Sequence, residues 1–187
     1  MPLLMQNQWV SIANRALARI GTQSISSLDE GSTASLYCSK LLPEAVQSVY
    51  GQYDWRSARK RIQLAPLETD PIYEWDYAFQ LPSDFARLIS VDTENEYSLE
   101  GQTILSNDED LYITYIAYPI EATFIPGYIS HLLVTFLAFL LSTPMSSNES
   151  MAQRLLGEYQ IALERAKIDD NAGVYQTPAE SFYEDLR

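Results

Sequence analysis

The feature that most constrains this chain is a change in the spacing of its apolar residues. Residues 5–20 place Trp9, Ile12 and Leu17 on one stripe at helical intervals, and a similar spacing returns in the last third of the chain. Between about residues 57 and 119 apolar and polar residues alternate, which is the period of a pleated strand. This order predicts an α+β fold, with a helical bundle core of about four helices and an inserted antiparallel β region.

Four helices are expected, at residues 5–20, 32–50, 128–142 and 149–168. Pro43 should kink or divide the second helix, because proline lacks one backbone N–H and clashes with the preceding turn. The third helix is apolar almost all round and lies between Pro126 and Pro144. That pattern indicates a buried, central helix. The helices are therefore expected in two regions of the chain, at about residues 5–52 and 127–170.

Six short strands are expected, near residues 59–64, 75–81, 87–93, 97–99, 103–105 and 111–118. In the second, Trp75, Tyr77 and Phe79 should share a face, and Pro82 should end the ladder because it has no N–H to donate. The last strand is apolar or aromatic on both faces and therefore needs cover on both sides. One cover could be the helices, and the other could be a neighbouring subunit.

A single domain is expected over residues 1–173, followed by a C-terminal docking tail at 174–187. The tail has no clear period, but it carries four apolar anchors on a polar background: Tyr175, Phe182, Tyr183 and Leu186. Such anchors are typical of a segment that docks on a partner. The alternative is a frayed terminus.

The charge of the chain is strongly acidic and unevenly distributed. The formal net charge is −13, and residues 62–153 carry 14 acids against the single base Arg87. Such a surface repels phosphate, so tight binding of DNA is not expected. The one basic cluster consists of Arg56, Arg59, Lys60 and Arg61. It either protects a strand edge or pairs with acids of a neighbouring copy. The candidate interface consists of these four residues, of Tyr112 and Tyr115 in the strand expected at 111–118, and of the four tail anchors.

The residues that usually carry chemistry are few. His131 is the only histidine and Cys38 the only cysteine, so the usual zinc shell and an intrachain disulfide are both out of reach. We therefore expect that the protein is not an enzyme and binds no cofactor or metal. We also expect it to assemble in a reducing compartment. Two alternatives stay open. Paired acids at 108–110 could serve a small wall-degrading, glycan-hydrolysing enzyme. The apolar segment 128–141 could serve a membrane-active protein, although it is shorter than the roughly 20 residues of a membrane span.

Several short motifs occur in a familiar order. They are Ile12-Ala13-Asn14-Arg15-Ala16-Leu17, then Ile20-Gly21, then Ile25 with Leu28-Asp29, then Trp55 with Ala58, and then Trp75, Tyr77, Phe79, Leu81-Pro82 and Asp84. An apolar helix and a final amphipathic helix follow. In this order the chain resembles the tail tubular protein A family of short-tailed bacteriophages, whose members are head-to-tail adaptors, or connectors.

The resemblance implies a structural virion protein. Family members form a dodecameric ring between the portal protein and the tail nozzle protein and line part of the DNA channel. The partners implied are therefore further copies of the chain, the portal and the nozzle, with genomic DNA passing through without specific binding. The resemblance also implies assembly in the host cytoplasm and a place in the neck of the virion, with no membrane and no cofactor.

Overall fold

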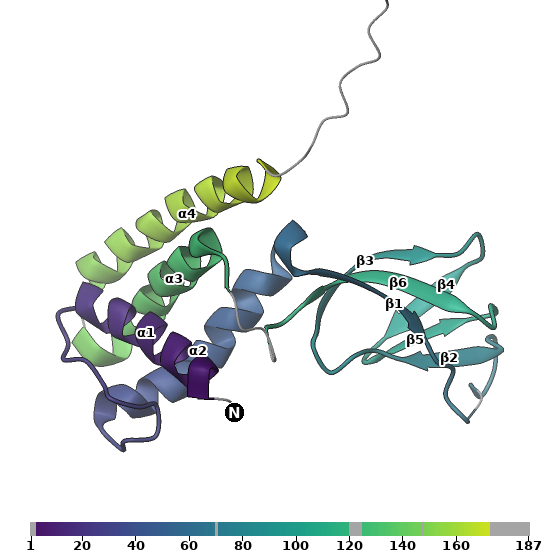
Figure 1. The fold of residues 1–187 in the computed structure, drawn as a ribbon, viewed down its shortest axis with the longest axis horizontal. Helices are drawn as coiled ribbons and strands as arrows, with labels where there is room; N and C mark the ends of the chain where they lie inside the picture. Colours follow the sequence, from purple (N-terminus) through teal and green to yellow (C-terminus); the bar gives the residue numbers. More distant parts are fainter. Residues whose placement is uncertain (1–2, 70, 120–124, 147, 173–187) are drawn as a thin grey trace, which may run out of the picture.

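The computed structural model describes residues 3–69, 71–119, 125–146 and 148–172. Within them the fold is α+β, as predicted, with four α-helices and two small antiparallel sheets. Figure 1 shows an elongated molecule in which the helices form one end and both sheets form the other. The described part of the chain begins and ends with helices, so the β part is an insertion into the helical bundle.

The helical part consists of α1 (Leu3–Arg19), α2 (Thr33–Gly51), α3 (Gly127–Ser146) and α4 (Glu149–Asn171). α3 packs against the other three and is therefore the central helix. Its buried hydroxyls are satisfied within the helix: Thr135 Oγ1 donates to the Leu132 carbonyl at 2.8 Å, and Ser142 Oγ to the Phe139 carbonyl at 2.6 Å. By length and composition α3 could also cross a membrane, with a mean hydropathy of 1.6, but half of that stretch is buried inside the protein.

Both prolines expected to limit helices lie inside them. α2 continues through Pro43, so of the two expected effects of this proline, a kink or a division, the division does not occur. The Pro43 side chain is exposed, and water can therefore reach the backbone carbonyl that the missing N–H leaves free. α3 continues two residues past Pro144, and Ser146 Oγ closes its last turn by donating to the Ser142 carbonyl at 2.7 Å.

The β part contains β1 (Arg59–Leu64), β2 (Tyr77–Gln80), β3 (Phe85–Asp92), β4 (Tyr97–Glu100), β5 (Thr103–Ser106) and β6 (Leu111–Ala117). One sheet has the order β1-β6-β3 and the other β2-β5-β4, and every pairing is antiparallel. The strand expected at 75–81 begins only at Tyr77. Glu74 has a φ of 70°, which interrupts an extended backbone, so Trp75 lies before the strand.

The central strand β6 contributes to two hydrophobic cores. Ile113, Tyr115 and Ala117 face the second sheet and pack there with Phe79 and Ile104. Their neighbour Ile116 points the other way and joins the core of the helical bundle. The helices and the second sheet therefore supply the two covers that this strand needs, and the second of them comes from within the chain. On the opposite face, towards the distal end, Tyr112 stays 47% exposed.

Candidate assembly interface

The two parts of the molecule meet at Trp55, which is fully buried. Its indole Nε1–H donates to the Val49 carbonyl at 2.7 Å, which ties the residue to the end of α2. The Tyr53 ring meets the indole edge-on, with 4.9 Å between centroids, and the Tyr128 ring lies at 6.4 Å. Aromatic packing and one buried hydrogen bond therefore fix the direction in which the chain leaves the bundle.

Asp170, near the end of α4, holds the same junction from the other side. Its carboxylate is 5% exposed and accepts hydrogen bonds from the Arg56 N–H at 2.8 Å, the Ser57 N–H at 3.4 Å and the Tyr128 hydroxyl at 2.7 Å. The two N–H groups open the short 3₁₀ helix η1 (Arg56–Ala58), which has no side-chain cap of its own. Asp170 thus supplies the missing cap. The sequence does not reveal this role, because more than 110 residues separate the acid from the two N–H groups it caps.

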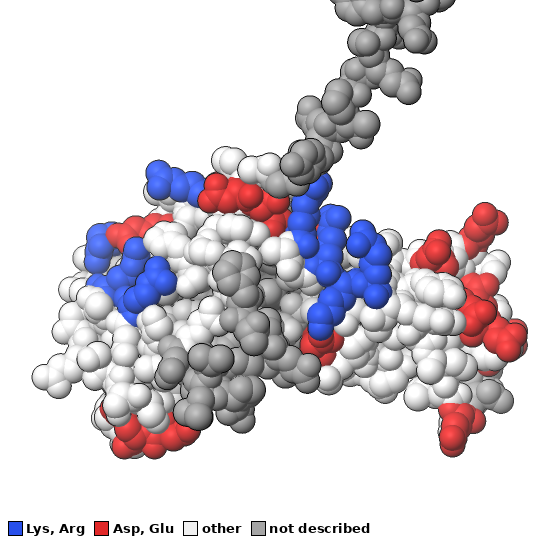
Figure 2. Space-filling view, in the orientation of Figure 1, with Lys and Arg blue, Asp and Glu red and all other residues white. Residues whose placement is uncertain are grey.

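The predicted basic cluster lies at this junction, and Figure 2 shows Lys and Arg gathered where the helical and β parts meet. Half of the cluster is already paired. Arg59 Nε donates to Asp54 Oδ1 at 2.6 Å, and this bond raises the pKa of Arg59, while Lys60 forms an ion pair with Asp84. Arg56 and Arg61 are exposed, and neither forms an ion pair within the described residues. They are the members of the cluster that remain for a partner.

The two strand tyrosines differ in availability. Tyr112 stands at a shallow hollow of about 600 Å³ on the outer face of the first sheet, beside Arg61, Ser90 and Asp92. Tyr115 is only 2% exposed, and its hydroxyl donates to Asp84 Oδ1 at 3.0 Å. Burial and this hydrogen bond raise the pKa of Tyr115 to about 12. Tyr112 therefore offers surface to a partner, whereas Tyr115 belongs to the core. The tail anchors Tyr175, Phe182, Tyr183 and Leu186 lie outside the described residues.

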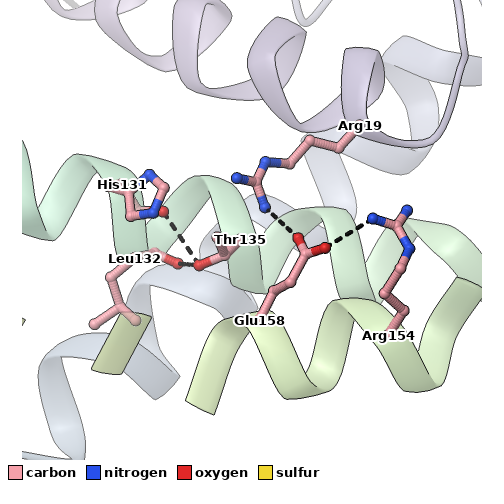
Figure 3. Close-up of polar contacts among 6 residues, drawn as sticks. All are labelled: Arg19, His131, Leu132, Thr135, Arg154 and Glu158. Carbon is pink, nitrogen blue, oxygen red and sulfur yellow. Dashed lines mark hydrogen bonds and ion pairs between the residues drawn. The ribbon is translucent and has the colours of Figure 1, made fainter. Parts of the chain in front are cut away.

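A second basic group, which the sequence did not reveal, lies on the helical bundle. Figure 3 shows Arg19 of α1 and Arg154 of α4 both pointing at Glu158, at 2.9 and 2.7 Å. His131 is exposed on α3, although many residues of this helix are buried. Partial burial of its ring and the nearby Arg19, Arg15 and Arg165 lower the pKa of His131. Residues from three different helices, α1, α3 and α4, supply this group, so no local sequence pattern predicts it.

A mostly apolar groove of about 510 Å³ opens between α1, the 26–29 loop and α2. Its lining includes Trp9, Leu28, Leu42, Val46 and Tyr118. The loop at its edge is held by Glu30, which accepts from the Ser26 hydroxyl at 2.6 Å, the Ser32 hydroxyl at 2.7 Å and the Ser26 N–H at 2.7 Å. These bonds lower the pKa of Glu30 to about 2.

Asp108, the first of the paired acids, does not have the environment of a general acid. Hydrogen bonds from Thr93, Asn95 and Ser106 hold the pKa of Asp108 below its ordinary value, whereas a general acid needs a raised pKa. In the part of the chain that the structure describes, no three His, Cys, Asp or Glu side chains gather closely enough to hold a metal ion. Compared with known protein families and with curated proteins, the sequence matches none.

Proposed function

We propose that this chain is a structural head-to-tail adaptor of a short-tailed phage virion, which forms an oligomeric ring between portal and tail nozzle. The observation that carries the proposal is the junction at Trp55, where buried contacts join the helical bundle to the β part. A four-helix bundle ends there and a β extension begins, at the position where the sequence resembles the adaptor family. In the proposed ring the helices form the wall and meet the portal, and the β part reaches toward the nozzle.

The residues that carry the resemblance also support the fold. Ala13 and Ala16 are fully buried against the rest of the bundle. Asn14 forms two hydrogen bonds with the backbone of Ile25: its Nδ2 donates to the carbonyl at 2.9 Å, and its Oδ1 accepts from the N–H at 2.7 Å. The motif at residues 12–17 therefore stabilises the helical bundle through burial and hydrogen bonding. A structural role of this kind is expected in a protein whose function is assembly.

The distribution of charge favours contacts between copies. Figure 2 shows acidic residues at the far end of the β part and basic residues at its base. A head-to-tail contact joins two different patches of the same protein, and a rotation that closes gives a ring. In the proposed contact, Arg56 and Arg61 of one copy meet acids of the next. Tyr112 adds exposed aromatic surface beside Arg61, as is common at interfaces.

Native mass measurement and negative-stain imaging, with and without the portal protein of the same phage, test the proposal. We expect rings of this chain alone or on the portal, and we expect the double variant Arg56→Glu/Arg61→Glu to form fewer of them. Lys40→Glu, an exposed basic residue on α2 away from the junction, is the matched control. A protein that stays monomeric and does not bind the portal would contradict the proposal.

Two further assays separate the proposal from its rivals. Digestion of purified cell wall that is lost on changing a single carboxylate would favour the enzyme. Flotation with lipid vesicles would favour a membrane-active protein, in which α3 leaves the bundle. For an adaptor we expect neither activity.

A further inference from the structure

The outer face of α4 carries an unusual stripe of side chains. Arg154, Ile161, Arg165 and Ile168 follow one another at intervals of seven, four and three residues, which places them on one side of a helix. Ile161 is 59% and Ile168 68% exposed, and both arginines are exposed as well. The opposite side of α4, with Leu155, Tyr159, Ala162 and Ala166, is buried against the bundle. The stripe is thus an apolar and basic surface on an acidic protein.

The surroundings of the stripe carry both signs of charge, because Glu164 and Asp169 of α4 are exposed next to Arg165 and Ile168, and Glu164 pairs with Lys167. Further bases come from the other helices. Arg19 and Arg15 of α1 and His131 of α3 lie on the same side of the bundle, and Arg165 is close enough to His131 to lower its pKa. Within the described residues, the acid bonded to this group is Glu158, which is shared between Arg19 and Arg154. A segment that combines acidic and apolar side chains would complement such a surface.

The chain itself contains a segment of that chemistry directly after α4. Residues 173–187 carry the acids Glu180, Glu184 and Asp185 against the single base Arg187. They also carry four large apolar anchors, which are Tyr175, Phe182, Tyr183 and Leu186. Aromatic rings stack favourably on guanidinium groups, and the acids can pair with them.

The length of the segment fits the stripe. Arg154 precedes Ala172 by 18 residues, which is about 27 Å along the helix axis. About eight extended residues cover that distance, so fifteen residues suffice and leave several for the reversal. The segment begins with Gly173, the residue type that most easily reverses a chain after a helix.

We propose that residues 173–187 fold back along α4 of their own chain and bind this stripe. The acids pair with Arg165, which forms no ion pair within the described residues, and the apolar anchors cover Ile161 and Ile168. Tethering raises the effective concentration of the segment to the order of millimolar, which offsets its repulsion by a protein of negative net charge. The inference rests on the α4 surface and the tail sequence alone, and is independent of the adaptor function.

Paramagnetic relaxation in the full chain tests the contact. A spin label is placed on Ser181→Cys. Cys38 does not compete for the label because it is fully buried, and burial raises its pKa to about 11. We expect amide signals between Arg154 and Ile168 to lose intensity, while amides of β4 keep theirs. The loss should weaken in 1 M salt, where the Debye length falls to about 3 Å.

Matched variants identify the contacts. Arg165→Glu and Ile161→Ser should restore the α4 signals, whereas Arg61→Glu and Leu99→Ser, exposed changes in the β part, should not. Unchanged amide spectra elsewhere show that each variant stays folded. Three results would overturn the proposal: no loss of α4 signal, a loss that Arg165→Glu leaves unchanged, or a loss that appears on unlabelled chains mixed with labelled ones. The last result would place the segment on a second copy.

Discussion

At the scale of single residues, the junction between the two parts depends on a few buried polar contacts. Trp55 binds a carbonyl of α2, and Asp170 binds two backbone N–H groups of η1 and the hydroxyl of Tyr128. The Trp55 bond is buried, and the carboxylate of Asp170 is nearly so, although Arg56 and Ser57 themselves are exposed. A polar group that burial deprives of its partner costs free energy. A single carboxylate thus connects three segments that lie far apart in the sequence.

We predict that Asp170→Ala lowers the free energy of unfolding by about 1–3 kcal/mol, because it removes the acceptor of three partly buried donors at once. The midpoint of urea unfolding measures the loss. Asp169→Ala is the matched control, since this neighbouring acid is exposed and its removal should change little. Equal effects of the two variants would show that the buried contacts at Asp170 do not stabilise the junction.

At the scale of elements, the sequence predicted which segments are helices and which are strands, but it predicted their first and last residues less well. The long helical stripes and the alternating strands were sufficient to place all four helices and six strands, because burial on one face imposes a period on the residues. The ends near Trp75 and Pro144 were wrong, because a left-handed Glu74 and a hydroxyl bond from Ser146 decided them locally. The second basic group, on the helical bundle, could not be predicted from the sequence because its residues come from three different helices.

Pro43 gives a prediction for α2. Pro43→Ala should raise the free energy of unfolding by about 2–3 kcal/mol, because proline costs about 3 kcal/mol inside a helix and regains up to about 1 kcal/mol by restricting the unfolded chain. Urea unfolding again measures the change. Pro144→Ala, in the last turn of α3, should gain less. A loss of stability on Pro43→Ala would mean that the ring of Pro43 is needed at the edge of the apolar groove that it lines.

At the scale of the whole molecule, two hydrophobic cores are joined into one fold. The larger lies within the helical bundle and the smaller between the sheets, and β6 contributes Ile116 to the first and Tyr115 to the second. Tyrosines of both parts are shielded from water. Burial raises the pKa of Tyr50, Tyr118, Tyr128 and Tyr159 as well as that of Tyr115. Ionisation of these phenols should therefore oppose folding throughout the molecule.

The protein should accordingly lose stability in alkali. A phenol whose pKa is higher in the folded than in the unfolded state contributes its full stability below the unfolded value of about 10. For Tyr115 that contribution is lost as the pH rises through about 12. Urea midpoints across this window measure the decline, and phenolate absorbance follows the ionisation. Tyr115→Phe should show a shallower decline than the parent protein, and identical slopes would contradict the argument.

The way the β part is attached has a mechanical consequence. The chain enters it through β1 and leaves it through β6, and these neighbouring strands are hydrogen-bonded along six residue pairs, from Arg59–Ile116 to Leu64–Leu111. A body held at two adjacent points cannot swivel as one on a single linker can, although it can still rock about the line that joins them. The contact of β3 with α2 blocks this rocking. We therefore expect the β part to follow the helical bundle when the bundle tilts, which would move the acidic tip of the molecule.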